Sequence, residues 1–176
     1  MEPFAEVLAA GGRSNSLGRA GEVLALLRTD PSRVDELVAC ISADDAWVRM
    51  RAVDTFEKLV REDPSLGQPH LPHLLGELAR SEQASVQWHV AQLLALLDLD
   101  DDERAQAVRW LTGRLRTTEV DWIVAAQSMA TLVGLHRDGH VTTGSVVPLL
   151  EVQTTHRSAS VRRKAARFLD EVRGRG

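Results

Sequence analysis

Apolar residues recur along this chain at the three- and four-residue spacing of amphipathic helices, and the pattern itself repeats every 37 residues. Within each segment the apolar positions fall at i, i+3 and i+7, which places them on one face of a helix. One series runs through Ile41, Leu78, Leu115 and Val152; two parallel series are Val34, Leu71, Val108 with Ser145, and Leu37, Leu74, Leu111 with Pro148. The spacing therefore predicts one amphipathic helix at the start of each repeat.

A second apolar helix is predicted to follow in every repeat. Its first anchors are Val48, Val86, Trp122 and Val161, at intervals of 38, 36 and 39 residues, followed four residues later by Ala52, Val90, Ala126 and Ala165. The mostly small residues at this later position let neighbouring helices approach closely. One helix pair cannot bury its own apolar stripes, so we expect the pairs to stack on one another.

These patterns predict a chain made entirely of helix pairs. The predicted pairs are about 32–42/45–62, 68–80/83–97, 101–116/119–136 and 143–156/158–173, with an N-terminal pair at about 3–10 and 17–28 around a loop at 11–16. Residues 42–45 and 118–121 have the spacing of capping boxes, with an acid at the fourth position. We predict a single domain, 1–176, with capping helices in 1–30 and repeats at 31–65, 66–99, 100–140 and 141–173.

Two second-helix segments carry a family resemblance. Residues 45–52 (DAWVRMRA) and 158–165 (SASVRRKA) resemble the signature of HEAT-like repeats, in which an acidic or small residue precedes Val-Arg and a later Ala. Residues 85–90 match more loosely, and residues 121–126 depart furthest from the signature. The resemblance covers roughly residues 31–173 and implies a right-handed α-solenoid of about four to five hairpins, with second helices on the concave, partner-binding side.

Positions two and six beyond each second-helix anchor point away from its apolar face, into the implied groove. They are Met50, Trp88, Val124 and Arg163, then Asp54, Gln92, Ser128 and Arg167. We interpret these eight residues as a surface for a segment of another protein, because Met and Trp are enriched in protein interfaces. The competing interpretation is that the apolar ones are ordinary core residues.

The predicted outer face of the third repeat presents a second candidate surface. Trp110 lies there, with Val147 in the corresponding place one repeat later. Together they predict a patch for weak self-association, unless a helix end or loop covers Trp110.

Composition narrows the function class. The net charge of −4 argues against a general nucleic-acid binder, although residues 157–176 hold seven Lys or Arg against two acids. The start of the chain lacks a signal-peptide pattern, and the apolar run Val90–Leu97 is too short to cross a membrane, so we expect a cytoplasmic protein. Cys40, the single cysteine, lies among apolar residues and is predicted to be a core residue.

No catalytic motif is recognisable. His70 with His73, and His136 with His140, lack the further ligands of a metal site, and residues 98–109 lack the Gly and Glu of a calcium loop. We predict a non-catalytic adaptor without a cofactor that binds a protein partner. HEAT-like units also occur in alkylpurine DNA glycosylases and bilin lyases; Trp88 and Asp54 would suit the glycosylase alternative, but a basic track for DNA is missing.

Overall fold

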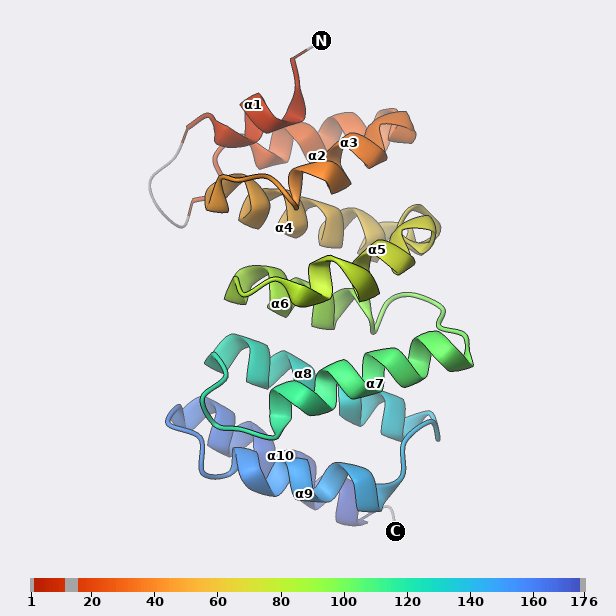
Figure 1. Cartoon of the computed structure of the whole chain (residues 1–176), viewed down its shortest axis with the longest axis vertical. Coiled ribbons are helices and arrows are strands. Elements are labelled where there is room, and N and C mark those ends of the chain that lie inside the picture. The colour runs from red at the N-terminus through yellow and green to blue at the C-terminus, as the bar shows by residue number, and fades with distance from the viewer. Residues whose placement is uncertain (1, 12–15, 175–176) are drawn as a thin grey trace. The chain divides into compact units, whose positions relative to one another are not determined.

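The computed structural model describes residues 2–11 and 16–174, and all regular structure in these ranges is helical (Figure 1). The predicted all-α fold is confirmed: the described residues form ten α-helices and four short 3-10 helices and no strand. Residues 12–15, part of the predicted loop at 11–16, lie outside the described residues. Contacts divide the chain into two compact units, residues 1–98 (unit 1) and 99–176 (unit 2).

Unit 1 is organised around its longest helix, α4, which packs against α1, α2, α3 and α6. Its helices are α1 (Phe4–Ala9), α2 (Ala20–Thr29), α3 (Val34–Cys40), α4 (Ala46–Glu62), α5 (Leu71–Gly76) and α6 (Ala84–Leu93), with 3-10 turns at Pro31–Arg33, Pro64–Leu66, Gln68–His70 and Leu78–Arg80. The predicted helix at 68–80 is broken into α5 and two 3-10 turns, since Pro69 and Pro72 interrupt backbone bonding there.

Unit 2 consists of two antiparallel helix pairs. They are α7 (Asp101–Leu115) with α8 (Trp122–Arg137), and α9 (Thr143–Gln153) with α10 (Ala159–Gly174). Helix α8 packs against α10, while α7 and α9 lie side by side on the other face of the unit (Figure 1). The predicted helix bounds in this half of the chain are confirmed to within a few residues.

Aspartates begin three of the longer helices, but not in the predicted arrangement. Asp45 Oδ1 accepts hydrogen bonds from the backbone N–H groups of Trp47 (2.7 Å) and Val48 (3.3 Å), and Asp121 caps α8 in the same way. The predicted capping boxes at 42–45 and 118–121 are therefore wrong, because the acid placed at the fourth position is itself the cap. A complete capping box occurs at α7, between Asp100 and Glu103.

The helix starts also correct the repeat register. In each of α4, α6, α8 and α10, the third residue of the helix is a valine that is at most 3 % exposed. These valines are Val48, Val86, Val124 and Val161. Their intervals are 38, 38 and 37 residues. The third anchor is therefore Val124, and the assignment to Trp122 is wrong: Trp122 is the first residue of α8 and is 52 % exposed.

The residue after the buried valine secures the preceding turn. Arg49 Nη1 donates to the carbonyls of Ala43 (2.7 Å) and Asp44 (2.8 Å), six and five residues earlier. Arg162 Nη1 makes the equivalent bonds to His156 (2.8 Å) and Arg157 (2.9 Å). The Val-Arg pair thus combines a buried anchor with a clasp for carbonyls of the turn that follows the first helix.

Arg51, three residues beyond Val48, fixes the N-terminal helices to α4. Its side chain is 3 % exposed and donates to the carbonyls of Leu8, Gly11 (3.0 Å) and Ser16 (2.9 Å), so it holds both ends of the connection between α1 and α2. Gly18, with φ +51°, leaves room for this arrangement: a Cβ there would lie 3.2 Å from Arg51 Cζ.

We expect Arg51→Met to lower the free energy of unfolding by about 3 kcal/mol, because it leaves buried carbonyls without donors. Urea denaturation followed by circular dichroism measures the change. Arg163→Met, which replaces an exposed arginine of α10, serves as the control and should change stability by less than about 0.5 kcal/mol. Equal effects of the two substitutions would contradict the structural role of Arg51.

Candidate functional site

The eight residues predicted to line a groove divide into three groups. Met50, Asp54, Trp88 and Gln92 lie on α4 and α6 of unit 1, which pack together, and all four are partly exposed. Arg163 and Arg167 are exposed on α10 of unit 2. Val124 and Ser128 are fully buried, so their prediction as surface residues is wrong. The cause is the register: Val124 is the anchor of α8 and Ser128 is the small residue four positions later.

Two of the four residues of unit 1, Asp54 and Gln92, belong to a polar cluster that was not predicted from the sequence. Lys58 Nζ donates to Asp54 Oδ2 at 2.6 Å, and Asp54 Oδ1 lies 3.9 Å from Nε2 of His89 on α6. We call Asp54, Lys58, His89 and Gln92 the α4–α6 polar cluster. Asp54 contacts a lysine of its own helix and an imidazole of α6, so the cluster connects two adjacent helices. Its members are buried or partly exposed.

His89 is the buried member of this cluster. It is 3 % exposed, and the Trp88 ring lies against it with centroids 4.4 Å apart. Burial lowers the pKa of His89 to about 4, although the nearby Asp54 carboxylate acts in the opposite direction. The imidazole is therefore neutral near pH 7. Its Nδ1 and the Oε1 of Gln92 are both buried, and interaction with the Gln92 side chain also acts against the effect of burial on the His89 pKa.

The repeat pattern of the sequence contains a signal that His89 is a polar, inward-facing residue. It lies three residues beyond Val86, and the corresponding positions after Val48 and Val161 hold Arg51 and Lys164. Each of these polar side chains reaches the preceding part of its own unit: Arg51 contacts the α1–α2 connection, and Lys164 Nζ donates to a carbonyl of α8 at 3.4 Å. Aligning the repeats on the buried valines would have marked this position as polar and inward-facing.

The chemistry of the cluster suits recognition. Asp54 already forms an ion pair with Lys58, and neutral His89 is covered by Trp88. Within the described ranges no group of three His, Cys, Asp or Glu residues is arranged to hold a metal ion. Cys40 is 6 % exposed, which confirms it as a core residue, and burial raises its thiol pKa.

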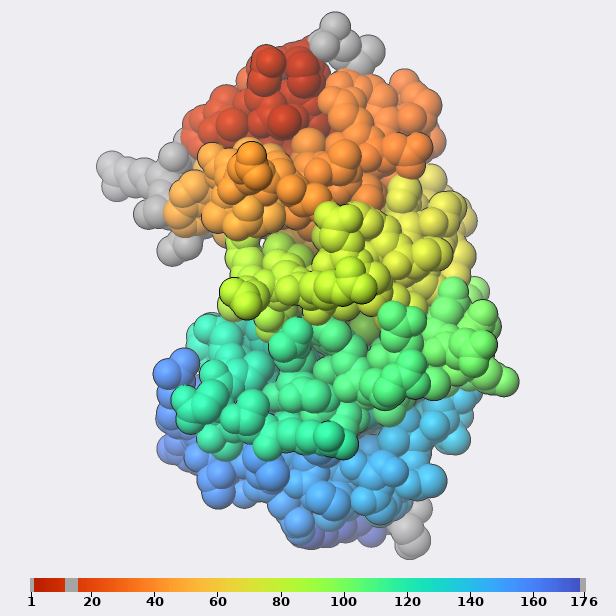
Figure 2. Space-filling view, in the orientation of Figure 1, coloured from red at the N-terminus to blue at the C-terminus, as the bar shows by residue number. Residues whose placement is uncertain are grey.

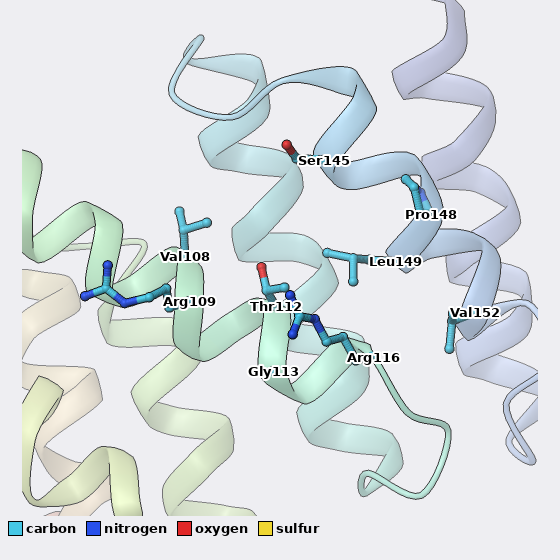
Figure 3. A pocket seen from close by; sticks show the side chains of 9 residues that line it. All are labelled: Val108, Arg109, Thr112, Gly113, Arg116, Ser145, Pro148, Leu149 and Val152. Carbon is cyan, nitrogen blue, oxygen red and sulfur yellow. The ribbon is translucent and has the colours of Figure 1, made fainter.

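A second candidate site lies in unit 2, on the face formed by α7 and α9. Side chains of the two helices enclose a trough of about 820 Å³ (Figure 3). Its lining is Val108, Arg109, Thr112, Gly113 and Arg116 from α7, and Ser145, Pro148, Leu149 and Val152 from α9. In Figure 2 this face of α7 and α9 is turned toward the viewer. We call this feature the α7–α9 trough.

The predicted self-association residues lie outside the trough lining. Trp110 is partly exposed, and the guanidinium carbon of Arg114 lies 5.0 Å from its ring centroid. Val147 is also partly exposed. Self-association through these two residues stays a prediction.

Comparison with known proteins gives no match: no family model matches the chain, and no curated protein or solved structure matches it. None of the helices in the described part of the chain is long and apolar enough to cross a membrane.

Acid should destabilise unit 1 through His89. The folded-state pKa lies below the 6.5 of an unperturbed histidine, so as the pH falls the unfolded chain binds the proton first. Protonation of His89 therefore leaves the free energy of unfolding unchanged above pH 6.5 and lowers it between pH 6.5 and about 4. We expect the native protein to lose about 1 to 3 kcal/mol more than His89→Gln over this window, measured by urea denaturation.

His140→Gln is the matched control for this measurement, because His140 is exposed. It should reproduce the native pH profile. A His89→Gln profile that also follows the native one would show that His89 titrates at its ordinary pKa.

Proposed function

We propose that this chain is a non-catalytic adaptor that binds a segment of another protein through the second helices of HEAT-like repeats. The proposal includes the finer architecture: the helix pairs are repeats of a right-handed α-solenoid. The recurrence of a buried valine at intervals of 38, 38 and 37 residues supports it, as does the Arg clasp after two of those valines. Stacked repeats of this kind offer extended surfaces for partners.

The observation that carries the proposal is the partly exposed apolar pair on α4 and α6. Met50 and Trp88 occupy the same position, two residues beyond the buried valine, on helices that pack together. Fully buried side chains would belong to the core, and isolated exposed ones would need no explanation. A partly exposed Trp and a partly exposed Met on adjacent helices give a partner anchoring points of the type that dominates interface energies.

Polar residues next to this pair would orient the partner. Asp54 and Gln92 occupy the position six residues beyond the valines on the same two helices. Both side chains are partly exposed, which leaves them accessible to polar groups of the partner. On α10 of unit 2, Arg163 and Arg167 are exposed and would by themselves favour an acidic ligand.

The enzyme alternatives have less support. A DNA glycosylase would use a carboxylate such as Asp54 against a cationic sugar, but Asp54 forms a 2.6 Å hydrogen bond with Lys58. Binding to DNA would also depend on many lysine and arginine contacts. The bilin-lyase alternative has no specific residue in its favour.

Quantitative affinity capture from cell extract tests the proposal. Trp88→Ala should reduce recovery of the specifically bound protein at least about tenfold, because it removes a central aromatic contact. Trp122→Ala is the matched control: it removes a more exposed tryptophan, at 52 %, from the start of α8. This control should keep the native recovery.

The same partners recovered in the same amounts by native protein and Trp88→Ala would refute this surface. Circular dichroism and thermal denaturation of each variant establish that it is folded. A salt-dependent DNA gel shift at low ionic strength would instead favour the nucleic-acid alternative.

A further inference from the structure

We infer that the α7–α9 trough is a second docking site, independent of the proposed function, and that it binds an acidic amphipathic helix of a partner protein. Two stripes form it, each at helical spacing: Val108, Thr112 and Arg116 on α7, and Ser145, Leu149 and Val152 on α9. A helix lying between these two stripes would bind in the helix-in-groove mode of recognition.

The trough is held open by contacts beneath it. Gln153, at the end of α9, is fully buried and donates to the carbonyls of Leu115 and Thr117, both at 2.9 Å. These two bonds fix the C-terminal end of α7 to α9. Because the walls are already connected, a ligand would not have to order them, which reduces the entropic cost of binding.

Gly113 leaves open space along the trough. It lies inside α7, where glycine costs about 0.5–1 kcal/mol relative to alanine. A Cβ added there would meet nothing within 4 Å, as is also true of Gly134 in α8 and Gly144 in α9. A second backbone can therefore approach α7 closely at this position.

Charge selects the kind of helix. The lining has no acidic residue, and its two cations, Arg109 and Arg116, have no ion pair with any described residue. They are seven residues apart on α7, which is roughly 10 Å along a helix. In Figure 3 the Arg116 side chain runs along α7 toward Thr112, and Leu149 points toward the same residue. The apolar floor and only two cations favour an acidic peptide over a nucleic acid, which needs many phosphate contacts.

A display library of 18-residue helical peptides tests the inference. Peptides are selected on the native protein and counter-selected on Gly113→Leu, which fills the trough where a Cβ meets no atom of the chain. We expect the survivors to carry apolar residues at i, i+3, i+4 and i+7 with Glu or Asp about two turns apart. Survival of no peptide, or of peptides without acids, would overturn the inference.

One selected peptide, fluorescently labelled, is then titrated by anisotropy. Gly113→Leu and the charge-reversal variant Arg109→Glu/Arg116→Glu should each weaken binding at least about tenfold, while Gly113→Ala should weaken it much less. The charge variant alters only exposed side chains, so it also covers the case in which Gly113→Leu does not fold. Equal affinity for native protein and charge variant would overturn the inference.

Two further measurements separate other occupants of the trough. We expect the native protein to sediment as a monomer. A dimer in the native protein that the Gly113→Leu substitution abolishes would mean that a second copy covers the trough. A labelled RNA oligonucleotide that competes with the peptide would assign the trough to nucleic acid instead. Trp88→Ala should leave peptide binding unchanged, so failure of this site and failure of the proposed function are distinguishable.

Discussion

Burial of one valine near the start of each second helix sets the geometry of both units. The valine lies three residues after the helix-capping position, so helix start and core contact are fixed together. A small or medium residue follows four positions later, at Ala52, Val90, Ser128 or Ala165, and is also buried. This pairing lets α4 and α6 in unit 1, and α8 and α10 in unit 2, pack side by side. The positions two and six residues beyond the valine then become the candidate contact surface.

The polar residue three positions beyond the valine explains why these surfaces are not simply apolar. Arg51 and Lys164 donate to backbone carbonyls of the preceding elements of their own units. His89 instead faces the Asp54 carboxylate, and burial keeps it neutral. Buried polar groups are retained at low cost only when they find partners. In the α4–α6 polar cluster these partners come from within the cluster: Gln92 interacts with His89, and Lys58 pairs with Asp54.

The two candidate sites use different surfaces for different chemistry. The proposed adaptor surface of unit 1 combines a Met–Trp pair with a polar cluster. The α7–α9 trough of unit 2 has an apolar floor and cationic ends, and its helical walls contain Gly113 and Pro148. Glycine and proline weaken helices in isolation, so their presence here depends on the tertiary contacts that hold α7 and α9. Gln153 supplies two of those contacts.

Apolar periodicity and capping residues are local signals, so the all-helical fold, most helix bounds and the buried role of Cys40 could be predicted from the sequence. It placed Met50, Trp88, Asp54 and Gln92 correctly at partly exposed positions. It misplaced Val124 and Ser128, because Trp122 is as apolar as the true anchor and only the helix start distinguishes them. Tertiary structure alone decided the Asp54–His89 approach and the α7–α9 trough, since both join side chains from different helices, and their separation depends on packing that no local pattern records.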